Sequence, residues 1–437
     1  MTEFGGADEK ISLKLLAKHC VDACVRGCKE IRAVAKRNKR VMDDDGNFAM
    51  KKEKIKHTFK DENDARSALT EADVNAQSVI IGALRKSYGE RLNIVGEEDG
   101  DANAKPREDE EKLRDDCFEF SKMEEVEDVE VRVGDCVVFV DPVDGTREFI
   151  EERYQNCQCL IGIAHKGRAV VGVVGIPFPK GKITKDCDVE ALAVVYGMCY
   201  EKEDEGGTVV RVLETCNETL LGNAAAAATT IALAETTKTK TTKTPTTNQQ
   251  QQQKKQRVSS ETTTPSSPYI LTTGDSKSKA LRAAVEVVEE CIRDDNAYPT
   301  PPERLITGGA GNKILRVATG ISPSSSSSQQ TPPTTTPNDP SKQTKNAPPD
   351  CALMHMGTCA WDTAAPEAVL RASGGTVTDL FGSRLVYDCS NKNEAYVNAR
   401  GVLASSKRTV ESGLHDVFCQ KMRESETLLT LFGIDML

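Results

Sequence analysis

The chain has 437 residues, of which 38% are hydrophobic and 28% are charged, so it is long enough for two domains of ordinary size. Its formal net charge of −10 disfavours a nucleic-acid polymer as a partner, although local cations could still bind a small phosphate ester. No apolar run approaches the roughly 20 residues of a membrane-spanning helix, and the N-terminus lacks a signal-peptide pattern, so we expect a cytoplasmic protein.

Two amphipathic helices are predicted in the first hundred residues. One covers residues 11–36 and the other runs from about Ala72 to Ser87, each with apolar side chains at helical spacing.

Cys20, Cys24 and Cys28 lie on one stripe of the first helix. Metal ligation or redox sensing would explain that stripe, but we favour burial as small core residues. The chain's fifteen cysteines show no paired CxxC framework, which favours free thiols in a reducing compartment.

Acidic residues directly follow two predicted strands. Leu92–Val95 reads as a strand that leads into GEED, and Cys136–Val140 reads as a buried strand that leads into DPVDG. Because both strands deliver carboxylates at their C-terminal ends, we expect a site at one edge of a sheet. A β-hairpin signal follows at Lys166 and Gly167, between two apolar runs.

Three segments interrupt this pattern. Residues 100–130 are strongly acidic, and we expect them to be mobile. Residues 235–268 are rich in Thr, Lys and Gln, and residues 321–349 in Ser, Pro and Thr, so both are predicted to be disordered surface insertions. We predict an N-terminal domain at 1–222, which carries most of the candidate site, and a C-terminal substrate-binding domain at 223–437.

The remaining segments return to regular structure. TTGDSKSKALRAAVEVVEECI reads as the end of a strand, a loop and a helix, and GGAGNKILRVATG reads as a glycine loop that opens a helix. In CAWDTAAPEAVLRASGG, Asp362 stands where it could cap the start of a helix that ends at Gly374 and Gly375.

The stretch DPVDGT, Asp141 to Thr146, concentrates the groups of a metal site. Its proline favours a turn that would bring Asp141 and Asp144 together, and packed carboxylates need a cation or a proton between them. Carboxylates with the Val143 carbonyl are hard oxygen ligands of the kind that Mg²⁺ or Ca²⁺ prefers. Gly145 lets the backbone approach a ligand closely, and the Thr146 hydroxyl could orient a water. Surface turns often have the same DxxDG pattern, so this stretch alone is weak evidence.

Three motifs taken together make the chain similar to a known family. GEED, DPVDGT and WDTAAPE, in this order, resemble the signatures of the lithium-sensitive, magnesium-dependent inositol monophosphatase superfamily. LTEAD before the first motif, GGAGNKI before the third and PEAVLRASGGTVTDLFG after it resemble the 3'(2'),5'-bisphosphate nucleotidase branch. The resemblance covers about residues 11–410 apart from the insertions. It implies a fold of the α+β or α/β class. The expected architecture is the layered αβαβα sandwich of inositol monophosphatase-like sugar phosphatases.

The resemblance also implies roles for individual residues. The implied ligands of two or three Mg²⁺ ions are Glu97, Asp141, the Val143 carbonyl, Asp144 and Asp362. Thr146 matches the family's catalytic threonine, and Asp73 in LTEAD matches the aspartate paired with it. Taken alone, Asp73 would read as a solvated helix residue and Glu97 as a charge at a strand end. Glu98 stays outside the predicted ligand set.

The implied substrate contacts are Gly145, Thr146 and Asp362, with three more from the second half of the chain, Thr273, Gly309 and Lys313. Lys313 could hold a second phosphate, or could be an ordinary exposed lysine. The sequence departs from the branch at one point. Relatives carry Arg-Ser-His where this chain has Gly274, Asp275 and Ser276, which puts the substrate in doubt.

Three hypotheses follow for the function. The first is a Mg²⁺-dependent, Li⁺-sensitive phosphatase that removes the 3'-phosphate of adenosine 3',5'-bisphosphate, with a link to sulfur assimilation, and that also accepts 3'-phosphoadenosine 5'-phosphosulfate. The second keeps the chemistry and takes an inositol phosphate as the substrate. The third is a non-catalytic nucleotide-binding or scaffold protein, which the loss of a metal carboxylate would favour; no such carboxylate is lost.

Overall fold

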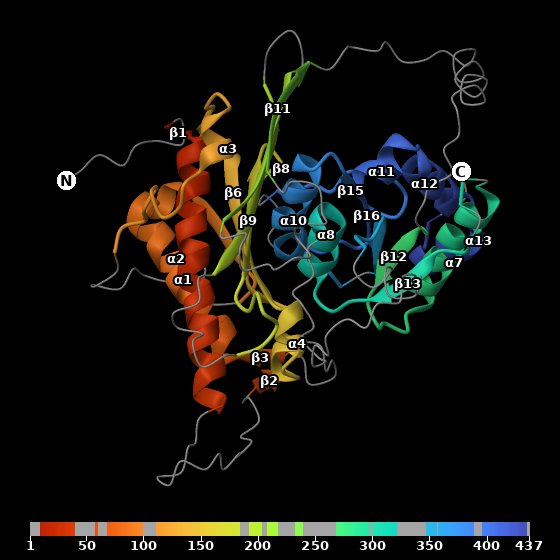
Figure 1. Cartoon of the computed structure of the whole chain (residues 1–437), viewed down its shortest axis with the longest axis horizontal. Coiled ribbons are helices and arrows are strands. Elements are labelled where there is room, and N and C mark those ends of the chain that lie inside the picture. The colour runs from red at the N-terminus through yellow and green to blue at the C-terminus, as the bar shows by residue number, and fades with distance from the viewer. Residues whose placement is uncertain are drawn as a thin grey trace, which may run out of the picture.

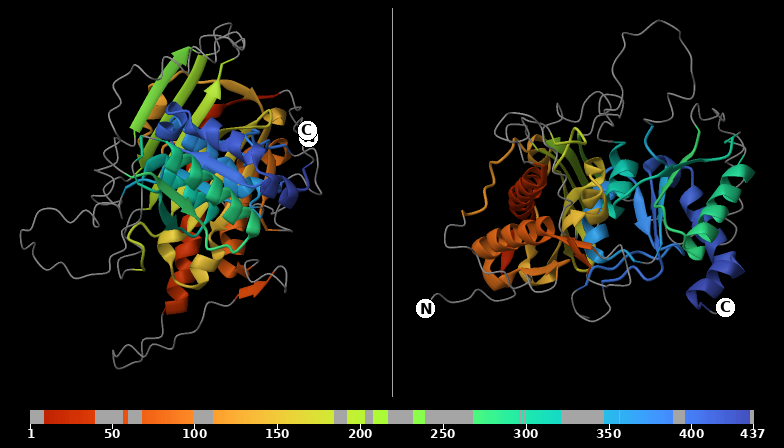
Figure 2. Two further views of the ribbon diagram at one scale, coloured as in Figure 1. Left: turned by 90° about the vertical axis from the view of Figure 1, so that its right-hand side faces the viewer. Right: turned by 90° about the horizontal axis from the view of Figure 1, so that it is seen from below.

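The computed structural model describes most of the chain in thirteen stretches, which are 9–39, 57–59, 68–98, 111–183, 192–202, 208–216, 232–238, 268–295, 297–298, 300–320, 347–355, 357–388 and 396–434. Two β-sheets alternate with three layers of helices, as Figure 1 shows from left to right. The right-hand view in Figure 2 shows the same order of layers, with one sheet and its helices toward each end. The expected αβαβα sandwich is confirmed.

The larger sheet has seven strands in the order β11-β10-β9-β8-β7-β6-β4. Neighbouring strands are antiparallel except β4 and β6, which are parallel. Because helices cover both faces, the strands read as nearly continuous apolar runs rather than alternating ones. Their bounds are β4 Asn93–Gly96, β6 Cys136–Asp144, β7 Gln158–His165, β8 Arg168–Ile176, β9 Ala193–Glu201, β10 Thr208–Cys216 and β11 Ala232–Lys238.

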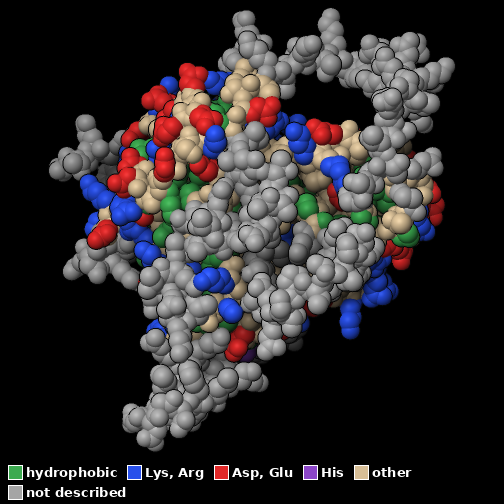
Figure 3. Space-filling view, viewed as in Figure 1, with side chains coloured by type: hydrophobic (Ala, Val, Ile, Leu, Met, Phe, Trp, Pro, Cys, Tyr) green, Lys and Arg blue, Asp and Glu red, His purple; other side chains and the backbone are tan. Residues whose placement is uncertain are grey.

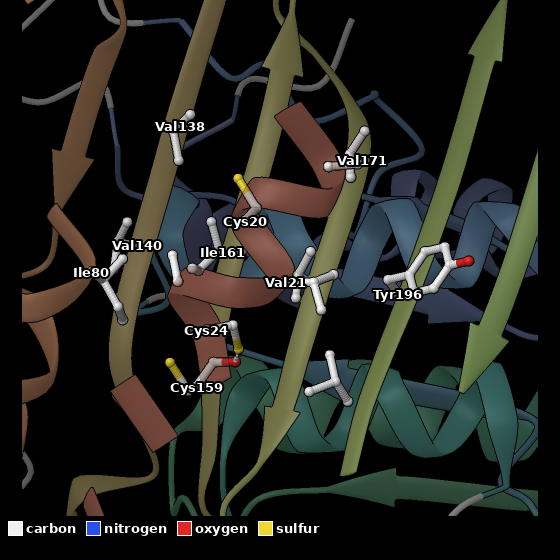
Figure 4. Packing of buried hydrophobic residues seen from close by; sticks show 14 of the residues in the cluster. Cys20, Val21, Cys24, Ile80, Val138, Val140, Cys159, Ile161, Val171 and Tyr196 are labelled. Atoms are coloured by element: carbon white, nitrogen blue, oxygen red, sulfur yellow. Dashed lines mark hydrogen bonds between the residues drawn. The ribbon is translucent and has the colours of Figure 1, made fainter. Parts of the chain in front are cut away.

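Helices α1 (Leu13–Lys39) and α2 (Glu71–Tyr88) cover the outer face of this sheet. Their apolar faces pack on β6, β7 and β8, and Figure 4 shows Ile80 of α2 beside Val140 of β6. Both helices fall within a few residues of the predicted ranges. Burial of this apolar stripe is the main force that holds the layer together.

The central layer consists of α8 (Ala310–Thr319) and α10 (Ala360–Ala372). Helix α10 lies directly on the backbone of β7, β8 and β9, because each strand presents a glycine there. A Cβ atom at Gly172 of β8 would stand only 1.9 Å from the carbonyl oxygen of Ala365. This close approach fixes where the N-terminal end of α10, and with it Asp362, meets the larger sheet.

The smaller sheet has five strands in the order β13-β12-β14-β16-β15, parallel among the first three and antiparallel afterwards. Helices α7, α12 and α13 cover its far face. The bounds are β12 Ile270–Thr273, β13 Glu303–Ile306, β14 Cys351–Met354, β15 Thr376–Thr378, β16 Val402–Ser405, α7 Lys279–Asp294, α12 Leu414–Glu424 and α13 Glu426–Phe432.

Short elements complete the described chain. Two-stranded pairs join β1 with β5 and β2 with β3. The bounds are β1 Lys10–Ser12, β2 His57–Phe59, β3 Ala68–Thr70, β5 Glu130–Arg132, α3 Ser121–Glu124, α4 Thr146–Ile150 and α11 Lys407–Glu411, with 3₁₀ turns at Gly89–Arg91, Val133–Asp135 and Tyr154–Asn156.

On the face seen in Figure 3, acidic side chains gather around α3, in keeping with the negative net charge. Among the described helices, none is both long and apolar enough to cross a membrane.

Two expectations about the interrupting segments are corrected. Residues 111–130 were expected to be mobile, but they dock on α1 and the larger sheet through buried side chains spaced along the acidic sequence; these are Leu113, Phe120, Met123 and Val126. Residues 235–238, predicted to open a disordered insertion, instead complete β11 and pair with β10. The rest of that insertion up to residue 267, and residues 99–110 and 321–346, lie outside the described residues.

The predicted boundary at 222/223 precedes β11, which pairs into the larger sheet. The division into two domains stays a prediction.

Candidate active site

A cavity of about 580 Å³ lies where the C-terminal ends of β4 and β6 meet the N-terminal ends of α8 and α10. Its walls come from segments that are far apart in the sequence. They include the DPVDGT stretch, the glycine loop before α8 and the WD motif at the start of α10. The sheet edge at which we predicted a site therefore forms one wall of this cavity.

The DPVDGT stretch is an irregular strand rather than the predicted turn. Strand β6 continues through Asp144, and its pairing with β7 shifts register between Asp141 and Asp144. Gly145 then adopts a left-handed backbone with φ of 88°, and α4 begins at Thr146. Cross-strand bonds to β7 keep the segment extended, and the irregularity still turns both aspartates toward the cavity.

Three carboxylates converge at the bottom of the cavity. Asp141, Asp144 and Asp362 each offer an oxygen, and these oxygens all lie within 4.8 Å of one another. Asp141 is 1% exposed and Asp144 is 3% exposed. Burial, followed by the charges of Glu97, Asp144 and Asp362, raises the pKa of Asp141 well above its ordinary value. The metal-free cluster is therefore electrostatically unfavourable.

The cluster fits a hard divalent cation. Oδ1 of Asp141 is buried, and among the described residues it has no hydrogen-bond partner, so it is available to a ligand. The donors are carboxylate oxygens, with Glu97 and Val143 also lining the cavity. Oxygen-only donor sets of this kind suit Mg²⁺, Ca²⁺ or Mn²⁺ rather than thiophilic metals.

Asp144 is held by the start of α8. The main-chain N–H of Ala310 donates to one carboxylate oxygen at 2.8 Å, and that of Asn312 donates to the other at 3.1 Å. Burial raises the pKa of Asp144 to about 6, although Lys313 and these N–H groups oppose the rise. The glycine loop therefore positions a carboxylate as well as lining the cavity.

Asp362 is fixed by its own helix. Its carboxylate accepts a hydrogen bond from the main-chain N–H of Cys359, which forms a capping box at the start of α10. Trp361 packs against the ring of Tyr396 with centroids 5.9 Å apart, which anchors the same turn. The predicted capping role of Asp362 is confirmed, and its position in the cavity follows from it.

Asp73 and Thr146 form a hydrogen-bonded pair. The Thr146 hydroxyl lies 3.0 Å from Oδ1 of Asp73 and 3.1 Å from the Val143 carbonyl oxygen, and it can donate to either. Oδ2 of Asp73 accepts from the main-chain N–H and the hydroxyl of Thr70, which caps α2. Burial raises the pKa of Asp73 to about 6, the Thr70 hydrogen bond opposes the rise, and the Glu97 charge adds to it. Asp73 is therefore poised to change charge near neutral pH.

The two glutamates of GEED lie in different surroundings. Glu97 lines the cavity, and its main-chain N–H donates to the Val140 carbonyl oxygen at 2.9 Å. Glu98 is buried, and its backbone exchanges two hydrogen bonds with the Gln77 side chain, at 2.9 and 3.0 Å. The structure thus places Glu97 with the aspartates and puts Glu98 outside the lining residues.

The predicted substrate residues divide into two groups. Gly145, Thr146, Gly309, Lys313 and Asp362 line the cavity, whereas Thr273 is buried behind the wall. The Thr273 hydroxyl donates to the carbonyl oxygen of Gly274, so its side chain is used inside the protein.

Lys313 is 7% exposed and donates from Nζ to the Gly309 carbonyl oxygen at 2.7 Å. Burial lowers its pKa, and the charges of Asp144 and Asp362 partly offset this effect. It is not an ordinary exposed lysine.

Arg147 and His355 line the cavity and were not singled out from the sequence. Arg147 of α4 forms an ion pair with Asp275 across the cavity mouth, with 3.0 Å between the guanidinium nitrogen and the carboxylate oxygen. His355 also lines the cavity, although no histidine was singled out from the sequence. Arg147 directly follows Thr146, and this adjacency could have predicted that it lines the cavity. No feature of the sequence near His355 predicts its position.

Comparison with known proteins shows which family and which proteins the chain is similar to. The sequence pattern of the inositol monophosphatase family matches residues 16–321 and 350–427. The chain is 29% identical over 343 residues to a 3'(2'),5'-bisphosphate nucleotidase 1 of Rattus norvegicus, covering 77% of this chain and 78% of that protein. It is 26% identical over 363 residues to the Homo sapiens protein of the same name, covering 82% of each. Among solved structures, CysQ of Bacteroides thetaiotaomicron aligns over 91% of this chain and 98% of its own, with 16% identity and a TM-score of 0.44.

Proposed function

The chain belongs to the inositol monophosphatase family, and we propose that it is a Mg²⁺-dependent phosphatase that hydrolyses the 3'-phosphate of adenosine 3',5'-bisphosphate, giving AMP and phosphate. The converged carboxylates of Asp141, Asp144 and Asp362 carry this proposal. The names of the relatives in rat and human support the nucleotide over other phosphate esters. Sensitivity to Li⁺, activity on 3'-phosphoadenosine 5'-phosphosulfate and a cytoplasmic location belong to the same proposal.

The acidic residues would hold the metal. Glu97, Asp141, Asp144 and Asp362, with the Val143 carbonyl, would bind two or three Mg²⁺ ions. When bound, these ions supply positive charge that offsets the phosphoryl oxygens and eases the deprotonation of water.

The chain's own residues orient the water. Ionised Asp73 accepts the Thr146 hydrogen bond, so the threonine oxygen keeps its lone pairs for a proton of the attacking water. The water oxygen attacks phosphorus, the bond to the 3'-oxygen breaks in line, and the leaving oxygen takes a proton. No phosphoenzyme is formed.

The positive groups around the cavity suggest how the second phosphate is held. Lys313 and Arg147 both line the wall on the side of α8 and α4. Lys313 is fixed by Gly309 and is buried beside the carboxylates, whereas Arg147 is 43% exposed at the mouth. We assign the 5'-phosphate to Arg147 and Lys313, with Gly145 and Gly309 allowing the backbone to approach the substrate.

One observation favours the inositol phosphate alternative. Asp275, in the segment where the sequence departs from the branch, already pairs with Arg147. An anionic 5'-phosphate would compete with the Asp275 carboxylate for Arg147, whereas a substrate with a single phosphate would not. The Arg147–Asp275 pair therefore makes substrate choice the central question.

Phosphate release tests both parts of the proposal. The full-length protein is assayed with Mg²⁺ on adenosine 3',5'-bisphosphate, inositol 1-phosphate and inositol 1,4-bisphosphate, and kcat/KM is compared side by side. A preference for the nucleotide, with AMP as the product, supports the proposal. A preference for either inositol phosphate would establish the alternative, and no hydrolysis of any of the three would exclude the assigned reaction.

A further inference from the structure

Behind the carboxylate site, on the other face of the larger sheet, three cysteine sulfurs meet. Cys24 and Cys28 lie one turn apart on α1, and Cys159 lies on β7. Their Sγ atoms are all within 4.8 Å of one another, and all three residues are 0% exposed. Figure 4 shows Cys24 and Cys159 side by side, where the Cys24 thiol donates to the Cys159 carbonyl oxygen at 3.5 Å. The helical stripe in the sequence contained two of these cysteines, but only the fold adds the third.

A glycine on β8 leaves room for the sulfurs of the cluster. A Cβ atom at Gly175 of β8 would lie 2.5 Å from the Cys28 sulfur and 2.6 Å from the Cys24 sulfur. A Cβ atom at Gly27 would lie 2.6 Å from Cδ1 of Ile80 and 3.2 Å from the Cys159 sulfur. Gly175 in particular therefore leaves the space that the Cys24 and Cys28 sulfurs occupy.

A buried cation lies near the cluster. Arg32 lies one further turn along α1 from Cys28 and is 6% exposed. A positive charge close to a thiol favours the thiolate, which is the form that binds a metal ion.

We propose that Cys24, Cys28 and Cys159 form a binding site for one Cu⁺ ion. With metal–sulfur bonds of about 2.3 Å, a trigonal set places its sulfurs about 4 Å apart, and the three Sγ atoms here all lie within 4.8 Å of one another. Soft thiolates select Cu⁺ or Zn²⁺ among common metals. Structural Zn²⁺ sites are almost always four-coordinate, and within the described chain this group contains three ligands. Binding would release the remaining thiol protons to solvent.

This site lies close to the carboxylate site without sharing residues with it. On β7, Gln158 pairs with Asp144 and Leu160 pairs with Asp141, so Cys159 stands between the two paired positions. Because side chains alternate along a strand, the Cys159 sulfur points to α1 while its two neighbours face the central helices. A bound ion would tie α1 to the strand that supports the irregular part of β6.

The test uses the full-length protein, reduced and without oxygen. Cu⁺ is supplied both to the folded protein and during refolding from denaturant, followed by competition with a Cu⁺ chelator and measurement of the copper-to-protein ratio. The variants are Cys28→Ala and Gly175→Ala, and the matched control is Cys20→Ala, one turn away on the same helix and also 0% exposed. Circular dichroism shows which variants are folded.

The expected result is one copper per chain in the wild type and in Cys20→Ala, with three-sulfur coordination by X-ray absorption. Cys28→Ala should bind at least about 100-fold more weakly. Gly175→Ala, whose added methyl competes with the sulfurs for space, should also lose the ion. The proposal is overturned if the wild type retains no copper by either route, if folded Cys28→Ala retains as much as the wild type, or if Zn²⁺ is retained in preference to Cu⁺.

Discussion

Replacing Asp141 by asparagine removes one charge from the buried carboxylate cluster while keeping the shape of the side chain. Asp141 is 1% exposed, and its oxygen lies within 4.8 Å of oxygens of Asp144 and Asp362. At an effective dielectric constant of about 20, each of the two repulsions amounts to about 3 kcal/mol or more. In the metal-free protein, burial and this repulsion raise the pKa of Asp141 well above its ordinary value.

The sign of the stability effect follows from that pKa. An acid whose pKa is higher in the folded than in the unfolded state contributes stability that is complete below the unfolded value of 3.8. That stability is lost as the pH rises through the folded pKa. Metal-free Asp141→Asn should therefore be close to the wild type near pH 4 and have an increasingly higher Tm as the pH rises from there through the folded pKa. Mg²⁺ should raise the Tm of the wild type and have much less effect on the variant.

Turnover should respond in the opposite direction. A bound metal ion contributes several kcal/mol of transition-state stabilisation, and about 1.4 kcal/mol corresponds to a tenfold change, so kcat should fall roughly 1,000-fold or more. The assays are phosphate release at saturating Mg²⁺ and thermal unfolding with and without Mg²⁺ at two pH values. The control is Asp135→Asn, which lies just before the same strand, has a side chain 36% exposed and is outside the cavity. A variant rate within tenfold of the wild type, or an equal Tm gain with Mg²⁺, would refute the assignment.

Four further predictions concern the other parts of the protein. Thr146→Val should lower kcat roughly 10²–10⁴-fold with little change in KM, because the Asp73 hydrogen bond that orients the water is lost; an unchanged kcat would exclude that role. Since the pKa of Asp73 is about 6 and its ionised form is the acceptor, log kcat against pH should fall below about pH 6, and Asp73→Asn should flatten that limb. Lys313→Met should raise KM for the bisphosphate tenfold to about 100-fold and change KM for a monophosphate much less, whereas equal increases would mean that it holds no second phosphate. Gly172→Ala should destabilise the fold by about 1–3 kcal/mol in urea unfolding, because the new methyl meets the Ala365 carbonyl; wild-type stability would contradict this packing.

Much of the local structure could be predicted from the sequence because its cause is local. Strands β4 and β6 are apolar runs that end in acids, helical spacing marked α1 and α2, and start and end signals marked α10. The motifs around Glu97, Asp141 and Asp362 gave the candidate ligands, and the structure brings all three to one cavity. The predictions that failed relied on local sequence patterns, and in these places tertiary packing determined the structure instead. The acidic residues 111–130 docked through widely spaced apolar side chains, and the proline-containing stretch became an irregular strand because β7 pairs with it.

What the sequence determined by itself is the set of elements, the family resemblance and the residue types available for chemistry, since propensity, periodicity and motifs act over a few neighbouring positions. The tertiary structure decided which distant groups meet. It joined Asp144 to the N–H groups of α8, which lie 166 and 168 positions away, and it paired Arg147 with Asp275 across the cavity mouth. It also added Cys159 of β7 to the two cysteines of α1. A strand or helix pattern encodes which face is buried but not which partner buries it, so these contacts depend on how the layers pack.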